Sequence, residues 1–160
     1  MIEVSEQHGE FVLSSGATST VYFDKFLFLT RPDLLRDVAK EVAKLIPAEV
    51  DHLASPEGAA MLLVAAVSLE SGLPTAIVRK QAKAYGTKVQ VEGYAPEGAR
   101  VALLEDVVTT GHQVLGAAKV LEAQGVIVEV IILALDRGGA DTLRDAGYRV
   151  ETVASLRPNG

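Results

Sequence analysis

Hydrophobic residues follow two alternating patterns along most of this chain. From residue 47 onward, short continuous apolar runs alternate with segments in which apolar residues recur every three or four positions. Continuous runs are typical of strands buried on both faces of a parallel sheet, and the three-or-four spacing is typical of helices. The alternation predicts an α/β domain, in which right-handed crossovers place helices on both faces of a twisted parallel sheet.

The turn residues between these segments set the expected bounds of each element. Pro47, Gly72 and Gly125 each follow a helical segment and are expected to end it. The helix that begins at Glu57 is apolar nearly all round, so we expect it to be buried. The expected strands are 52–55, 75–78, a strand from 101, 126–135 and 148–153, and the expected helices are 32–45, 57–69, 112–124 and a short one before Gly147.

The N-terminal segment shows a different pattern. Residues 11–16 and 18–24 are each typical of a short strand, and Gly16 suits the turn between them. Thr30 is placed to cap the next helix, whose first turn contains Pro32. We therefore expect a small substructure that precedes the sheet and packs against it from outside.

Composition narrows the class of protein. The chain has 160 residues, 49% of them hydrophobic and 22% charged, which is typical of one globular domain with a substantial core. It has no cysteine, and no apolar run has the length of a membrane span or the form of a signal peptide. We expect a cytoplasmic protein with no membrane partner. A net charge of −6 argues against nucleic acid as a partner.

The most informative stretch runs from Val101 to Gly111. Its apolar run leads into Glu105 and Asp106, then into a short Thr-Thr-Gly loop at the start of a helix. Ligands of open α/β sheets bind at such strand ends, and backbone amides at a helix start favour a phosphate. Carboxylates would repel that phosphate but accept hydroxyl groups well. The stretch predicts a sugar-phosphate site, with an ordinary strand–loop–helix corner as the alternative.

A second cluster is basic. Arg79, Lys80 and Lys83 lie just beyond an expected strand end, in an otherwise acidic protein. The segment from about 80 to 93 has little apolar content, so we expect a mobile loop, here named the basic loop. A loop of this kind can neutralise an anionic leaving group and exclude water. The alternative is a solvated basic turn, which is the usual role of a charge run.

The Glu-Asp stretch resembles the 5-phosphoribosyl-1-pyrophosphate (PRPP) motif of type I phosphoribosyltransferases. The resemblance implies that Glu105 and Asp106, here named the acidic pair, hold the ribose 2- and 3-hydroxyls. The phosphate loop after them is implied to hold the 5-phosphate. His112 and Gln113 stand where glycine and serine or threonine are more usual, so one hydroxyl contact to the phosphate is expected to be missing. The implied phosphate-loop residues are Val107, Val108, Thr109, Thr110, Gly111, His112 and Gln113.

Three further regions resemble orotate phosphoribosyltransferases. One is similar to that family's catalytic loop, one to its N-terminal base-binding signature, and one to an Asp-Arg pair after a long strand. The resemblance implies the type I phosphoribosyltransferase fold as a single domain over residues 1–160, with a small hood over the base at about residues 1–30. The matching segments are 78–86 with Glu92-Gly93, 11–16 with Tyr22-Phe23-Asp24, and Leu135-Asp136-Arg137.

The implied activity transfers the phosphoribosyl group of PRPP to orotate, giving orotidine 5-phosphate and pyrophosphate in pyrimidine nucleotide biosynthesis. The resemblance also implies Mg²⁺ held mainly by PRPP and water, and a homodimer whose basic loop reaches the neighbouring subunit's site. Implied roles are pyrophosphate binding for Arg79, Lys80 and Lys83, a further PRPP contact for Tyr85, orotate binding for Phe23, Thr109 and Arg137, and catalysis for Lys80, Lys83 and Asp106.

Three residues depart from the family pattern. Tyr85 replaces a histidine of the loop, and Ser14 replaces a lysine found in many members. Glu57 stands where many members have a lysine that binds pyrophosphate, so either its carboxylate points away or a metal ion bridges it. Two other functions stay open: a phosphoribosyltransferase for a purine or another base, and a non-catalytic regulator that senses PRPP.

Overall fold

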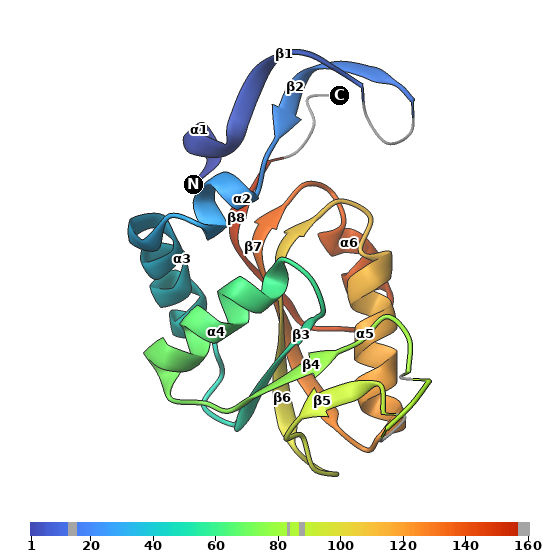
Figure 1. Cartoon of the computed structure of the whole chain (residues 1–160). Helices are drawn as coiled ribbons and strands as arrows, with labels where there is room; N and C mark the ends of the chain where they lie inside the picture. Colours follow the sequence, from blue (N-terminus) through green and yellow to red (C-terminus); the bar gives the residue numbers. More distant parts are fainter. Residues whose placement is uncertain (13–15, 83, 87–88, 157–160) are drawn as a thin grey trace.

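The computed structural model describes residues 1–12, 16–82, 84–86 and 89–156 (Figure 1). Its main sheet has six strands in the order β5-β4-β3-β6-β7-β8. All neighbouring strands are parallel except β5, which pairs with β4 in the antiparallel direction. The α/β sheet predicted from the sequence is confirmed, with one addition: the end of the basic loop forms an edge strand. The strands are β3 (His52–Pro56), β4 (Thr75–Val78), β5 (Val91–Gly93), β6 (Arg100–Val108), β7 (Ile127–Asp136) and β8 (Val150–Ser155).

Helices cover both faces of this sheet (Figure 1). Side chains alternate between the faces with a period of two. Ala102 and Leu104 of β6 therefore pack with the helices of one face, whereas Val101 and Leu103 pack with those of the other. The helices α3 (Pro32–Lys44) and α4 (Ala60–Ser71) cover the first face, and α5 (His112–Ala123) and α6 (Ala140–Asp145) cover the second. The chain thus forms two layers of core around the sheet.

Two expectations about helices are wrong. Thr30 does not cap α3: its hydroxyl donates to the Phe26 carbonyl of the preceding short helix α2 (Phe26–Leu29), and Arg31 occupies the N-cap position. The helix α4 begins at Ala60 rather than at Glu57, and it is buried on one face only. Its outer face leaves Leu69 90% exposed, because no described element covers that side. The C-terminal stop at Gly72 is confirmed, with a left-handed φ of +75°.

The N-terminal residues form the hairpin expected from the sequence, although its first strand lies earlier. The helix α1 (Ile2–Ser5) is followed by β1 (Glu6–Val12) and β2 (Thr18–Phe23), which pair in the antiparallel direction. Figure 1 shows this hairpin beyond the carboxyl ends of β6 and β7. The hood thus lies over the strand ends that carry the candidate site. None of the helices in the described ranges is long and apolar enough to cross a membrane.

Candidate active site

The acidic pair lies at the end of the central strand β6, and both side chains are buried. The Asp106 amide donates to Glu105 Oε1 at 3.0 Å, and the Val107 amide donates to Asp106 Oδ1 at 2.7 Å. Burial, followed by the neighbouring Asp106 carboxylate, raises the pKa of Glu105 to about 9. Glu105 therefore keeps its proton near neutral pH and can donate one hydrogen bond to a ligand as well as accept others.

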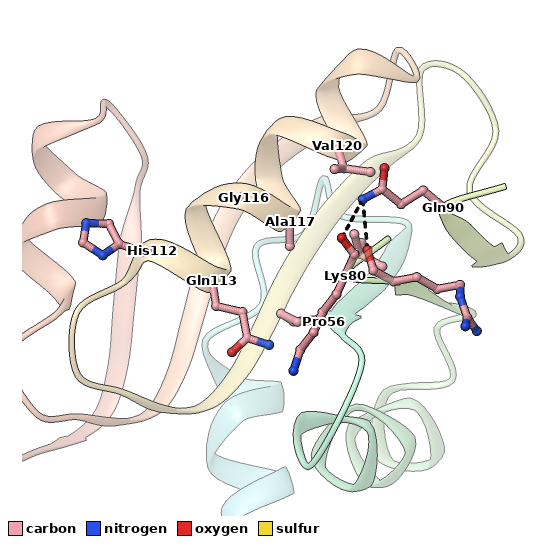
Figure 2. A pocket seen from close by; sticks show the side chains of 10 residues that line it. Pro56, Lys80, Gln90, His112, Gln113, Gly116, Ala117 and Val120 are labelled. Carbon is pink, nitrogen blue, oxygen red and sulfur yellow. Dashed lines mark hydrogen bonds between the residues drawn. The ribbon is translucent and has the colours of Figure 1, made fainter. Parts of the chain in front are cut away.

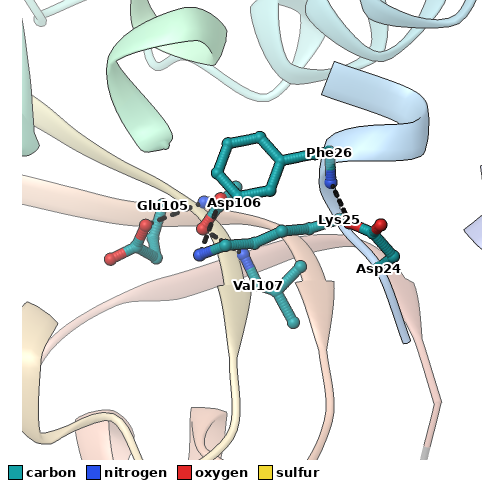
Figure 3. A network of polar contacts seen from close by, with 6 residues as sticks. All are labelled: Asp24, Lys25, Phe26, Glu105, Asp106 and Val107. Carbon is teal, nitrogen blue, oxygen red and sulfur yellow. Dashed lines mark hydrogen bonds and ion pairs between the residues drawn. The ribbon is translucent and has the colours of Figure 1, made fainter. Parts of the chain in front are cut away.

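A lysine of the hood reaches the acidic pair (Figure 3). Lys25 Nζ lies 3.2 Å from Asp106 Oδ2, with the lysine side chain 38% exposed and the aspartate 1% exposed. Sequence reasoning missed this residue. Its position directly after the Tyr22-Phe23-Asp24 segment, in a region expected to face the site, was the available signal. The ion pair means that the hood contributes charge to the sugar end of the site.

The phosphate loop connects β6 to α5 and borders a cavity of about 90 Å³. Gly111 has a φ of +82° and caps α5 without a side-chain hydrogen bond from any described residue. Gly139, in the loop after β7, packs against it so closely that a Cβ would lie 2.3 Å from Val108 Cγ1. Only glycine fits that approach. The close approach of the two loops therefore fixes the loop geometry, and the N-terminus of α5 borders a space suited to an anion.

The two unusual residues of the phosphate loop point in different directions. Figure 2 shows Gln113 directed toward Lys80 and His112 directed away from it, although His112 also borders the groove drawn there. Both are exposed. Gln113 lies between the phosphate-loop cavity and a groove of about 310 Å³ that also reaches Lys80 and Gln90. Gln113 is therefore the better placed of the two to contact a ligand that spans both spaces.

The root of the basic loop is held by a small set of polar contacts. Glu57 Oε1 accepts the Lys80 amide at 2.6 Å. The Arg79 amide donates to the Gln90 carbonyl at 2.7 Å, and Gln90 Nε2 donates back to the Arg79 carbonyl at 3.1 Å. Arg79 Nη1 also lies 3.8 Å from Glu92 Oε1. The Glu57 carboxylate thus fastens the loop root rather than standing as an isolated negative charge.

A cavity of about 200 Å³ joins these parts. It brings together segments that are far apart in the sequence, since its lining comes from the hood, the β3–α4 turn, the loop root, β6 and α5. The charged and polar lining residues are Lys25, Glu57, Lys80, Glu105, Asp106 and Gln113. A ligand here would meet both hydroxyl-binding carboxyl groups and cations, which suits a sugar that carries an anionic leaving group.

Two of the three residues expected to bind orotate, Phe23 and Arg137, meet at the hood. The Arg137 guanidinium lies 5.4 Å from the centre of the Phe23 ring, within the range of a cation–π contact. The Arg137 amide donates to the Val108 carbonyl at 2.8 Å, which places it beside the exposed Thr109. Phe23 is only 9% exposed and also packs at 6.5 Å from the Phe28 ring. In this structure Phe23 presents little surface of its own to a ligand.

Some predicted site residues are not brought to the cavity. Tyr85 is 79% exposed and lies with the outer part of the basic loop. Lys83 and Ser14 lie outside the described residues. Their predicted roles therefore stay predictions.

Comparisons with known proteins place this chain among phosphoribosyltransferases. A family model described as "Phosphoribosyl transferase domain" matches residues 29–155, which include the acidic pair and the phosphate loop. The orotate phosphoribosyltransferase of Methanocella arvoryzae is 41% identical over 147 residues, covering 91% of this chain and 84% of that protein. The protein of the same name from Thermococcus gammatolerans is 43% identical over 145 residues, covering 88% of this chain and 77% of that protein.

A solved structure agrees with these sequence matches. The crystal structure of orotate phosphoribosyltransferase from Aeropyrum pernix superposes with a TM-score of 0.82 at 29% identity, over 95% of this chain and 88% of that one. The hood is thus included in the structural match, although the family model begins only at residue 29.

Proposed function

The chain belongs to the orotate phosphoribosyltransferase family, and from this premise we propose that it transfers the phosphoribosyl group of PRPP to orotate. The bond between ribose C1 and the pyrophosphate oxygen breaks, and its electron pair leaves with pyrophosphate. A bond between C1 and a ring nitrogen of orotate forms, which gives orotidine 5-phosphate. The observation that carries the proposal is the cavity shared by the hood, the loop root and the acidic pair, next to the phosphate loop.

The sugar end of PRPP is assigned to the buried part of the site. We assign the ribose hydroxyls to the acidic pair and the 5-phosphate to residues 107–113. The protonated Glu105 can donate to one hydroxyl, while Asp106 accepts from another. Because the core fixes both groups before the ligand arrives, little entropy is lost in arranging them.

The pyrophosphate end is assigned to the loop root. Arg79 and Lys80 supply positive charge near the cavity, and Lys83, outside the described residues, is expected to add to it. Since charge develops on the leaving group as the C1–O bond breaks, cations that meet it then would lower the barrier. The contact of Glu57 with the Lys80 amide supports the view that this carboxylate points to the loop rather than to pyrophosphate.

The orotate end is assigned to the junction of the hood and β7. The Arg137 fork can bind the orotate carboxylate in a bidentate manner, with Thr109 beside it. Because Phe23 presents little surface of its own, it would act mainly by orienting Arg137 from behind through the observed ring contact. At neutral pH the negative charge of orotate is on its carboxylate, and the reacting ring nitrogen still carries a proton. That proton is released as the C1–N bond forms and passes to a pyrophosphate oxygen or to water, so the step assigns no protein group as a general base.

Magnesium is proposed as the cofactor. In the part of the chain that the structure describes, no three His, Asp or Glu side chains gather as a metal cage. Glu105 keeps its proton and Asp106 is paired with Lys25, so this donor set fits an ion held mainly by PRPP and water. When bound, Mg²⁺ supplies charge neutralisation for pyrophosphate.

We also propose a homodimer in which each basic loop serves the neighbouring site. Exposed Met61, Leu62 and Leu69 on α4 support an apolar contact with another chain. Mixing Lys83→Ala chains with Asp106→Asn chains should restore part of the activity through one hybrid site, and no rescue after confirmed subunit exchange would contradict loop sharing. A cytoplasmic location remains a prediction, supported by the absence of cysteine.

One assay tests the proposed function. Pyrophosphate release from PRPP with Mg²⁺ is measured with orotate, uracil, adenine, guanine or no base. We expect release with orotate and only background with the others. Release with a purine instead would change the substrate, and PRPP binding without release for any base would favour the non-catalytic regulator.

A further inference from the structure

Lys25 stands at a junction whose backbone is held from several sides. The Asp24 amide donates to the Ser5 carbonyl at 2.8 Å, and Asp24 Oδ1 accepts the Phe26 amide at 3.0 Å. The Lys25 carbonyl accepts the Leu29 amide at 3.1 Å, at the start of α2. Phe28 and Leu29 anchor that helix in the core. These contacts tie residues 24–26 to one another and to α2, so we expect the junction of residues 23–26 to shift together.

This junction makes one contact with each of two strand ends. Lys25 Nζ contacts the Asp106 carboxylate at the end of β6, as Figure 3 shows. Two residues earlier, the Phe23 ring contacts the Arg137 guanidinium just after β7. The Arg137 amide in turn donates to the Val108 carbonyl, two residues after Asp106. The contacts form a closed ring that links the hood to both strand ends.

The two ends of this ring coincide with the two proposed substrate contacts. Asp106 is assigned to a ribose hydroxyl and Arg137 to orotate. A hydroxyl that arrives at Asp106 must share the carboxylate with Lys25, whose side chain lines the same cavity. Phe23 lies two residues before Lys25, so a change in the lysine contact can shift the Phe23 side chain and with it Arg137.

We propose that Lys25 is a positioning residue that couples PRPP binding at Asp106 to orotate binding at Arg137, an inference that rests on the proposed function. A hydroxyl that joins Lys25 at Asp106 shifts the lysine and the junction with it, and Phe23 then moves Arg137 into the position that binds the orotate carboxylate. By reciprocity, orotate strengthens binding at the sugar site. A lysine that merely neutralised buried Asp106 would change stability and PRPP affinity, but not the dependence of one ligand on the other.

The test measures this dependence directly by calorimetry with Mg²⁺. The probes are orotate and a carbocyclic PRPP analogue that has a methylene in place of the ring oxygen and does not react. The coupling is the ratio of the orotate Kd without the analogue to the Kd with it. The variants are Lys25→Met and Lys25→Arg, with Lys40→Met, an exposed lysine of α3, as the matched control.

We expect a coupling of about 10-fold in the wild type and in Lys40→Met, within the usual range for linked sites. Lys25→Met should lower it to about 1, and Lys25→Arg should restore at least about half of it on a logarithmic scale. Should Lys25→Met fail to fold because Asp106 is left unpaired, Lys25→Met/Asp106→Asn removes both charges, and we expect it to lack coupling as well.

Two outcomes contradict different statements. Undiminished coupling in a folded Lys25→Met chain, or in the double variant, would overturn the role of Lys25 and leave the proposed function intact. Failure of the wild type to bind orotate, with or without the PRPP analogue, would overturn the proposed function, and the coupling with it.

Discussion

The sugar end and the pyrophosphate end of the site are built in opposite ways. At the end of β6, two carboxyl groups are almost completely buried, and each has partners from its own strand or from Lys25. At the root of the basic loop, Lys80, Gln81 and Ala82 are exposed, and contacts from Glu57 and Gln90 hold the backbone. The core therefore holds the side chains of the sugar end in place, whereas a few hydrogen bonds at the surface hold the pyrophosphate end.

The difference follows from what each end must do. A buried charge is costly unless it is paired, so the core arranges the acidic pair before any ligand binds. Pyrophosphate must enter and leave, and exposed cations can adjust to it at little cost. Ribose binding should therefore depend strongly on single atoms of the acidic pair, and pyrophosphate binding should depend weakly on each group of the loop root.

The largest expected effect comes from Asp106→Asn. An amide accepts a ribose hydroxyl less strongly than a carboxylate, and the change also leaves Lys25 without its charged partner. We expect PRPP affinity to fall by about 10- to 100-fold, the range for a lost charge-assisted hydrogen bond. Calorimetry with Mg²⁺ measures it, and Asp145→Asn on the exposed end of α6 is the control. Unchanged affinity would remove Asp106 from the ribose contact.

The next prediction concerns the proton on Glu105. Because its pKa rises from 4.5 in the unfolded chain to about 9 on folding, the native state binds the proton that the unfolded state releases between these values. This group therefore stabilises the fold below about pH 4.5, and that stability is lost as pH rises toward about 9. Glu105→Gln does not titrate, so its stability relative to the wild type should increase with pH.

We expect the stability difference between Glu105→Gln and the wild type to shift by about 1–2 kcal/mol between about pH 6 and about pH 8. Urea unfolding at both pH values measures the shift. The exposed Glu49→Gln serves as the control, for which no such shift is expected. A difference that does not change with pH would mean that Glu105 is ionised in the native state, like an ordinary surface carboxyl.

A smaller effect is expected at the loop root, from Glu57→Gln. The neutral amide oxygen still accepts the Lys80 amide, but more weakly than the carboxylate. The KM for PRPP should rise about 3-fold, consistent with roughly half of a typical net hydrogen bond. Steady-state kinetics measures it, with exposed Glu70→Gln as the control. A lower KM would show that Glu57 repels pyrophosphate instead of fastening the loop.

The smallest effect is expected for Tyr85→Phe. The Tyr85 side chain is 79% exposed, so removal of its hydroxyl costs at most one neutral hydrogen bond to a ligand. We expect kcat/KM to fall by less than about 5-fold. The exposed Tyr94→Phe is the matched control. A fall in kcat/KM as large as the loss of PRPP affinity expected for Asp106→Asn would contradict the proposed difference between the two ends of the site.

The pattern of residues was enough to predict the sheet and the place of the acidic pair. A continuous apolar run indicates a strand buried on both faces of a sheet, and such a run can be recognised from a few neighbouring residues. The Thr-Thr-Gly loop marked the start of α5 because it is a short polar segment between an apolar run and residues with helical spacing. The edge strand β5 was missed because its three residues carry too little apolar pattern to stand out from the loop.

The sequence by itself determined the alternation of strands and helices after residue 47 apart from β5, the Glu105-Asp106 corner and the family, because each depends on residues close together in the chain. The tertiary structure alone decided that Lys25 pairs with Asp106, that Glu57 fastens Lys80, and that Phe23 is buried against Arg137. It also decided that one face of α4 stays open. These contacts join residues that are distant in the chain, and local spacing carries no information about which distant groups meet.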